Sequence, residues 1–183
     1  MITNIMELGQ WNKEKIVAAL QRLGPCTKAD IAKETGLSMA TCSGIFNELN
    51  EEKEIIKVDH TGSGIGRPSD IFIFNNDYLH MLGLSIYKTK NGIGVGLAVS
   101  DAVGNIINSQ NMSYAAIDTD KIQEIVRDQL SEDSLIKVVG ISLPGVIGTG
   151  LVDSCEIHEL EGVDFKKLLQ DCFDVDVQVW NDM

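Results

Sequence analysis

The stretch from Thr27 to Asn50 constrains this chain most, because it predicts two short helices joined by a turn that few residues allow. Thr27 can cap the first helix, and Asp30, three residues later, suits the reciprocal role in a capping box. Gly36 follows the first helix where a left-handed backbone is needed, and a side chain there would cost about 1–2 kcal/mol. Ser38 can then cap the second helix. The stretch therefore predicts two helices that meet at a tight turn.

The second helix of this pair divides its residues between two faces. The apolar residues that recur at helical spacing are Cys42, Ile45, Phe46 and Leu49. The residues left facing outward are small and mostly polar, and they are Ser38, Met39, Ala40, Ser43, Gly44 and Asn47. A helix that enters a DNA major groove has such a surface. Amphipathic helix pairs also occur in proteins that never touch DNA, so this pattern alone leaves both interpretations open.

The residues after this helix pair favour DNA binding. Residues 55–58 and 71–74 are mostly apolar, and the glycine-rich segment HTGSGIGRPSD lies between them, which predicts strand, loop and strand. Three helices followed by such a hairpin make a winged helix-turn-helix. Arg67, fixed by Pro68 and surrounded by glycines, is predicted on a flexible tip that can follow a phosphate backbone or a narrow minor groove.

A further helix is predicted before residue 24. Asn12 is expected to cap it, with Trp11 and Ile16 closing a hydrophobic staple. Its buried stripe is predicted to contain Ile16, Leu20 and Leu23.

The length of 183 residues allows two small domains, which we expect at residues 1–78 and 79–183. The net charge of −12 is unevenly divided, since residues 1–79 carry −3 and the remainder carries −9. A protein that binds DNA through phosphate contacts alone would be basic. If the first domain binds DNA, it should therefore do so as an oligomer whose specificity comes from base contacts.

Cysteine spacing and hydropathy predict a cytoplasmic protein with no metal site and no membrane partner. The four cysteines form no CxxC pair, which favours reduced thiols and argues against zinc. No apolar run approaches the roughly 20 residues that span a bilayer. The segment MITNIMELGQWN lacks the basic start and apolar middle of a signal peptide.

From His80 onward the pattern changes to short apolar runs with a period of two. The predicted elements are strands at 81–87, 92–100 and 105–114, a helix at 120–130, a strand at 136–143, a helix at 164–173 and a strand at 175–180. A turn is expected at Asp101–Gly104. The strand at 136–143 is apolar at nearly every position, which predicts cover on both faces. This order is that of a ribonuclease H-like α/β domain without its final helix.

With these motifs in view, the chain resembles the ROK family, named for repressors, open reading frames and sugar kinases, and in particular its repressor branch. The likeness depends on the order and spacing of several segments, namely Thr27–Leu49, Gly66–Pro68, Leu82–Ile86, Asp101–Gly104, Gly140–Gly145, Glu161–Phe165 and Asn181–Asp182. The resemblance implies an α/β fold in which a winged helix-turn-helix precedes an actin-like, sugar-kinase lobe. On this resemblance, the chain is expected to contain only the first lobe of that domain.

The resemblance also implies a transcriptional regulator of sugar-metabolism genes. Its second domain would sense a sugar or sugar phosphate. The implied ligand-binding residues are Pro144, Gly145, Glu156, Asn181 and Asp182. A carboxylate beside a carboxamide can accept from and donate to neighbouring sugar hydroxyls. Glu156 stands where relatives carry a sugar-contacting Asn, so the pocket is expected to be altered.

Departures from the kinase branch predict that the protein is not an enzyme and needs no cofactor. Kinases of the family open this strand with an Asp, followed two residues later by a glycine pair whose bare backbone wraps a phosphate. This chain has Ser85 in place of the Asp, and Tyr87 and Lys88 in place of the glycines. Phosphoryl transfer with Asp182 as general base is therefore not expected. The zinc motif of the family is also absent, so the chain is interpreted as either a fragment or a natural truncation.

The leading hypothesis is a regulator that binds a double-stranded DNA operator as a homodimer. The candidate DNA-binding residues are Thr27, Lys28, Lys33, Ser38, Met39, Ala40, Thr41, Ser43, Asn47 and Arg67. The missing final helix predicts an exposed apolar sheet face that self-association would hide. The alternatives are a sugar kinase-like protein and a dimerising remnant that binds neither DNA nor sugar.

Overall fold

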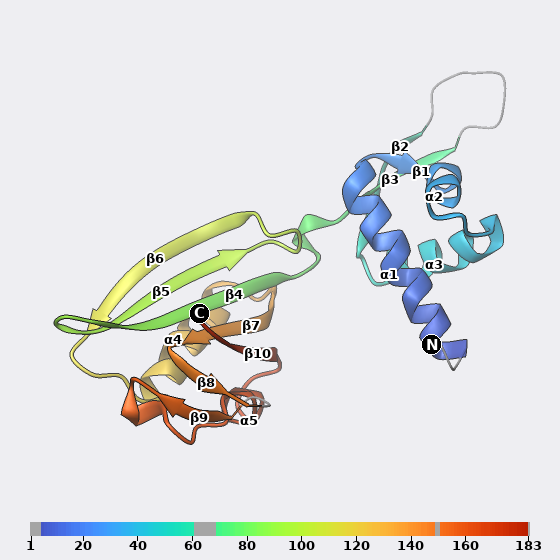
Figure 1. The fold of residues 1–183 in the computed structure, drawn as a ribbon. Coiled ribbons are helices and arrows are strands. Elements are labelled where there is room, and N and C mark those ends of the chain that lie inside the picture. The colour runs from blue at the N-terminus through green and yellow to red at the C-terminus, as the bar shows by residue number, and fades with distance from the viewer. Residues whose placement is uncertain (1–4, 61–68, 149–150, 183) are drawn as a thin grey trace. The chain divides into compact units, whose positions relative to one another are not determined.

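A computed structural model describes residues 5–60, 69–148 and 151–182 (Figure 1). The chain forms two compact units, Met1–Tyr78 and Leu79–Met183, and each has its own hydrophobic core. The described residues make a mixed α/β protein. A helix able to cross a membrane is not found in the part of the chain that the structure describes.

The first unit consists of three helices and a small antiparallel sheet. Its elements are α1 (Ile5–Leu23), β1 (Cys26–Thr27), α2 (Lys28–Thr35), α3 (Met39–Glu51), β2 (Ile55–His60), β3 (Asp70–Phe74) and the short 3-10 helix η1 (Asn76–Tyr78). The strands lie in the order β1-β3-β2. Phe46 of α3 meets Phe72 of β3 edge to face, with ring centroids 5.2 Å apart, which packs the helix onto the sheet.

The predicted turn between α2 and α3 is confirmed. Thr27 and Asp30 form a reciprocal capping box at the start of α2. Gly36 ends α2 in the left-handed conformation, with φ of 70°, and its N–H donates to Ala32 O. The Ser38 hydroxyl accepts from Thr41 N–H at 3.1 Å and caps α3. The apolar face of α3 is buried as predicted, except that Ile45 is only half-buried.

The predicted start of the first helix is wrong, because α1 begins at Ile5 and Asn12 lies inside it. The staple is also wrong, since Trp11 is 46% exposed and Lys15 Nζ lies 5.1 Å from the centroid of its ring. Leu23 is exposed, and Ala19 takes the third buried position instead. An asparagine inside a helix costs little free energy. Asn12 therefore does not interrupt a run of residues with high helix propensity.

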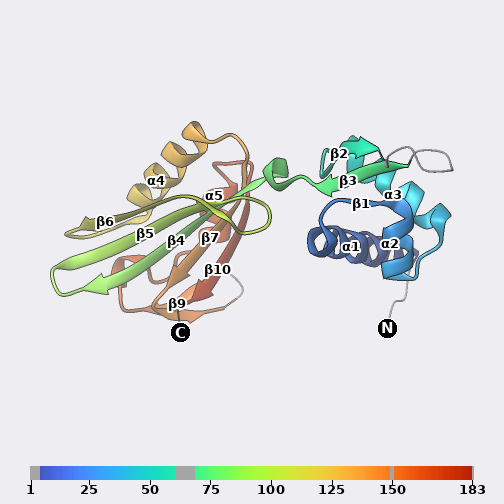
Figure 2. The ribbon, with the colours of Figure 1, turned by 90° about the horizontal axis from the view of Figure 1, so that it is seen from above.

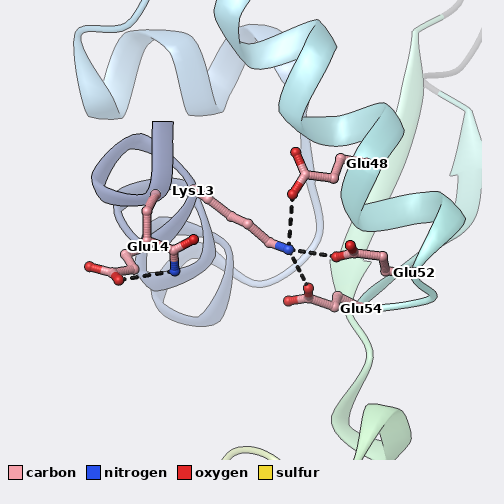
Figure 3. Close-up of polar contacts among 6 residues, drawn as sticks. Lys13, Glu14, Glu48, Glu52 and Glu54 are labelled. Atoms are coloured by element: carbon pink, nitrogen blue, oxygen red, sulfur yellow. Dashed lines mark hydrogen bonds and ion pairs between the residues drawn. The ribbon is translucent and has the colours of Figure 1, made fainter. Parts of the chain in front are cut away.

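A single lysine joins α1 to the far end of α3 (Figure 3). Lys13 Nζ lies 3.2 Å from Glu48, 2.5 Å from Glu52 and 2.7 Å from Glu54. Partial burial lowers the pKa of Lys13, but the hydrogen bonds to the three glutamates outweigh it and hold that pKa above its usual value. The ammonium is thus charged at neutral pH and offsets the mutual repulsion of the three carboxylates at the end of α3.

The second unit is built on a five-stranded sheet. Its elements are β4 (His80–Thr89), β5 (Gly92–Ser100), β6 (Ile106–Tyr114), α4 (Thr119–Glu132), β7 (Ile136–Leu143), β8 (Gly145–Ile147), β9 (Val152–Cys155), the 3-10 helix η2 (His158–Leu160), α5 (Phe165–Gln170) and β10 (Asp176–Asn181). The strand order is β10-β7-β4-β5-β6, and β8 pairs with β9 separately. The pairs β4–β5 and β5–β6 are antiparallel, whereas β7 is parallel to both β4 and β10.

One face of this sheet is buried by the helices, and α4 can be followed along it in Figure 2. The predicted cover of β7 on both faces is wrong within the described residues, because Val138, Gly140 and Ser142 remain half-exposed. The open face is less apolar than predicted, and the small residues on it include Gly83, Ser85, Gly96, Ala98, Gly140 and Ser142. Trp180, 54% exposed, lies over Gly140, where an added Cβ would be 2.7 Å from the indole.

Replacing Gly36 with alanine tests the turn. A Cβ at Gly36 would meet nothing within 4 Å, so the cost is backbone strain alone, and we expect Gly36→Ala to lower the free energy of unfolding by about 1–2 kcal/mol. Gly44 inside α3 is a matched control, because a Cβ there is equally unhindered, and Gly44→Ala should raise stability by up to about 1 kcal/mol. Urea unfolding measures both, and shifts of the same sign would contradict the left-handed turn.

Replacing Lys13 with methionine tests the charge network. We expect a loss of about 1–3 kcal/mol at pH 7, because three carboxylates lose a shared partner. Their mutual repulsion then raises their pKa values in the folded variant above those of the unfolded chain. The folded variant therefore binds more protons, and its stability falls as the pH rises through about 4 to 6. The deficit relative to the original chain should be smaller at pH 4 than at pH 7.

Lys33→Met serves as the control, because Lys33 is an exposed lysine of the same unit. It should change the free energy of unfolding by less than about 0.5 kcal/mol. Thermal unfolding at several pH values provides the comparison. A deficit for Lys13→Met that is independent of pH would contradict the electrostatic explanation.

Candidate functional site

The first candidate surface is the outward face of α3. Ser38, Ala40, Gly44 and Asn47 are exposed, and Met39 is 50% exposed. Thr41 and Ser43 are half-buried beside them. No charged side chain interrupts this group, so it presents short hydroxyl, amide and apolar groups that can approach the edges of bases.

The hydroxyls at the start of α3 already have partners. Ser38 Oγ accepts from Thr41 N–H and lies 2.8 Å from Thr41 Oγ1. The first turn of the helix therefore holds these two residues in place. Met39, Ala40, Ser43 and Asn47 are the candidates whose side chains follow this ordered start.

The candidates for backbone contacts differ in accessibility. Lys28 is half-buried, and its Nζ lies 5.6 Å from the ring centroids of both Phe46 and Phe72. Lys33 is exposed on α2. The Thr27 hydroxyl and N–H donate to Asp30, and these hydrogen bonds lower the pKa of that carboxyl. Arg67 and the predicted wing loop lie outside the described residues.

The second candidate site is a pocket of about 520 Å³ in the second unit. It lies where β4 and β7 end and the β8–β9 hairpin begins. Four of the five predicted ligand-binding residues line it, namely Pro144, Gly145, Glu156 and Asp182. The other lining residues are Tyr87, Lys88, Val146, Ser154 and Cys155.

Backbone forms part of the pocket wall at the β8–β9 hairpin. A Cβ added at Gly145 would lie 2.2 Å from Ser154 O, so only glycine allows these strands to pair. Glu156 N–H donates to Pro144 O at 3.1 Å and holds the other side of the hairpin. Burial raises the pKa of the Cys155 thiol, which leaves this lining group uncharged at neutral pH.

The predicted Asn181–Asp182 pair is divided between two roles. Asn181 is not among the lining residues, and its amide donates to Gly145 O at 2.6 Å. Asp182 N–H donates to Leu143 O at 3.0 Å, which extends the pairing of β10 with β7 and brings the exposed Asp182 to the pocket. Asn181 therefore supports the pocket, whereas Asp182 lines it.

The charges around the pocket are one ammonium and two carboxylates. Lys88 Nζ donates to Glu156 O at 3.4 Å, and the carboxylates belong to Glu156 and Asp182. The Tyr87 ring lies against Gly94, where an added Cβ would be 2.4 Å from the ring. The two carboxylates can accept hydrogen bonds from several ligand hydroxyls, and the ammonium can donate to a ligand oxygen.

Sequence reasoning missed Val146, Ser154 and Cys155 as lining residues. They belong to β8 and β9, strands of three and four residues that give little periodic signal. Tyr87 and Lys88 were singled out only as departures from the kinase pattern. Their place at the end of β4, beside a parallel strand that ends at Leu143, is the signal that indicates the pocket.

Comparisons with known proteins give relatives of both units. No family model matches the chain. A xylose repressor of Bacillus spizizenii is 22% identical over 93% of this chain and 46% of its own length. The chain thus spans about half the length of this curated relative.

Two solved structures have the same fold. A ROK family transcriptional regulator, described as a homologue of the Escherichia coli MLC protein, matches 96% of this chain and 46% of its own, with a TM-score of 0.73 and 20% identity. A candidate N-acetylmannosamine kinase from Listeria monocytogenes matches 57% of this chain and 35% of its own, with a TM-score of 0.50 and 21% identity. The fold is therefore one that ROK regulators and ROK kinases share.

The sequence relative and the solved regulator each match more than nine-tenths of the chain, and so include both units. The chain is therefore similar in sequence to a xylose repressor, and its fold is that of ROK family proteins.

Proposed function

We propose that this chain is a sequence-specific DNA-binding transcriptional regulator whose first unit is a winged helix-turn-helix. The observation that carries the proposal is the exposed, uncharged face of α3, which follows the left-handed turn at Gly36. In this assignment α3 enters the major groove and the β2–β3 hairpin forms the wing. The names of the xylose repressor and the ROK regulator support the same assignment.

The scarcity of basic residues favours binding as a dimer. The first unit carries a net charge of −3, and Lys28 already lies over two aromatic rings. Few phosphate contacts are then available to each copy, so two copies on paired half-sites would supply affinity that one copy lacks.

The second unit, in this proposal, senses a sugar at the pocket lined by Lys88, Glu156 and Asp182. Two carboxylates against one ammonium favour a neutral polyhydroxyl ligand over a phosphorylated one. Because the sequence relative is a xylose repressor, xylose is the first effector to test, and genes of sugar metabolism are the expected targets.

We do not assign kinase activity, although one structural neighbour is a candidate kinase. Tyr87 and Lys88 occupy the end of β4, where a phosphate would need bare backbone. A sugar kinase would require ATP turnover that is lost in Asp182→Asn, and we expect no such turnover.

The experiment that tests DNA binding is fluorescence anisotropy of the purified chain with duplex DNA from upstream of its own gene. A scrambled duplex of the same composition is the control, and both are measured at two salt concentrations. Preference for the upstream duplex that persists at the higher salt supports the proposal. Equal, salt-sensitive binding to both duplexes, or none, favours the dimerising remnant.

Replacing Asn47 with alanine should weaken operator binding by about 10-fold to 100-fold, because a bidentate amide contact to a base contributes about 1–3 kcal/mol. Asn47 is exposed on α3, and Gln21 is an exposed amide on α1 that serves as the matched control. Anisotropy titrations of Asn47→Ala and Gln21→Ala provide the comparison. Equal affinities for the two variants would remove Asn47 from the interface.

Replacing Arg67 with alanine should lower the slope of log affinity against log salt by about one unit, if the guanidinium meets a phosphate. This prediction comes from the sequence, since Arg67 lies outside the described residues. The same titrations, repeated over a range of salt, measure the slope. An unchanged slope would exclude Arg67 from phosphate contact.

Replacing Asp182 with asparagine should weaken sugar binding by about 10-fold or more, because hydrogen bonds to a charged acceptor contribute about 1.5–3 kcal/mol. Isothermal titration with xylose, and then with other neutral and phosphorylated sugars, measures the change. Asp120→Asn is the control, since Asp120 is exposed on α4 and does not line the pocket. Equal sugar affinities of the two variants would show that the sugar does not bind at this pocket.

A further inference from the structure

The sheet of the second unit ends in two edge strands of very different character. β6 forms one edge and β10 the other, and Figure 1 shows β6 as the outermost strand beside β5. β6 is nine residues long, and seven of its residues are exposed. A strand of this length presents a continuous row of backbone donors and acceptors on its outer side.

β6 lacks the charged residues and prolines that stop many edge strands from pairing. The sequence from Ile106 to Tyr114 contains no charged residue and no proline. The register shift opposite Val99 and Ser100 lies at one end and leaves the rest of the strand regular. Ile106 and Ile107 are 62% and 53% exposed, so apolar surface lies beside the open hydrogen-bonding groups. Natural monomers blunt such edges with lysine, proline or β-bulges, and the one irregularity in β6 is confined to its first residues.

The distribution of charge in this unit favours β6 over β10 as the edge at which two copies can pair. Residues 79–183 carry −9, so two copies repel each other over most of their surface. β10 is six residues long, contains Asp176 and is flanked by Asp174 and Asp182. An acidic edge resists pairing with an identical edge, whereas the uncharged β6 does not.

We infer that β6 is the surface on which two copies of this chain associate, by antiparallel pairing of β6 with β6 of the second copy. An antiparallel strand can pair with itself across a two-fold axis, which makes the contact self-complementary. The product is one sheet containing both copies' five strands, and its two remaining edges are both the acidic β10. Association therefore stops at two copies and does not continue into a fibre.

The inference depends on the sheet edge and not on DNA or sugar binding. It is tested without either ligand, so its failure leaves the proposed function to be judged separately. If both hold, the β6 pair supplies the two-fold symmetry that paired half-sites require.

A matched pair of charge variants tests the edge. Gln110 lies in the middle of β6 and Gln178 lies on β10, and both are exposed. Gln110→Lys places two ammonium groups at the proposed contact, whereas Gln178→Lys makes the same change in net charge at the opposite edge. Sedimentation equilibrium should show a dimer for the original chain and for Gln178→Lys, and at least a 10-fold weaker dimer for Gln110→Lys. Circular dichroism confirms that each variant is folded.

Disulfide cross-linking gives an independent measurement. In a Cys172→Ser background, which removes the exposed native thiol, single cysteines replace Ser109, Gln110 and Asn111 in turn. Directly opposed residues of antiparallel strands have Cα atoms about 4.5–5.5 Å apart, within the range for a disulfide. We expect mild oxidation to link two copies efficiently at one or two of these positions and not through Gln178→Cys.

Two outcomes would overturn the inference. The first is a chain that stays monomeric at concentrations of about 100 µM. The second is a dimer that Gln110→Lys leaves intact and that none of the β6 cysteines cross-links, which would assign association to another surface such as the open face of the sheet.

Discussion

The left-handed turn at Gly36 is the constraint on which the first unit depends. It ends α2, and the Ser38 cap two residues later starts α3, so the direction of the second helix is determined within three residues. The core then holds that direction, since Phe46 of α3 packs on Phe72 of β3. Lys13 holds the other end of α3 through three glutamates. With both ends fixed, the exposed face of α3 is presented as a rigid surface.

The second unit uses the ends of parallel strands in a comparable way. β4 and β7 run parallel and end near the β8–β9 hairpin, and β10 carries Asp182 to the same place. Side chains from segments far apart in the sequence thereby line one pocket. The backbone positions of Gly145 and Pro144 are fixed by Asn181 and Glu156 N–H. The charged groups at the pocket can then vary while the backbone wall stays in place.

Local signals in the sequence predicted local structure well. The caps at Thr27 and Ser38, the turn at Gly36 and the strand at 136–143 each depend on neighbouring residues, and all were confirmed. The start of α1 was predicted wrongly, because the capping tendency of Asn12 is weaker than the helix propensity around it. Burial of β7 on its second face depends on what else packs there, which an apolar run does not encode. The role of Asn181 required the position of Gly145 O in space, and no spacing in the chain gives that.

The contact at Gly145 limits how this pocket can diversify. A side chain there would collide with Ser154 O and separate β8 from β9, so that part of the wall tolerates no variation. Lys88, Glu156 and Asp182 are exposed and can be exchanged at little cost to folding. The charge of the pocket rim can therefore change through three positions among descendants of this chain, while the scaffold beneath them stays unchanged.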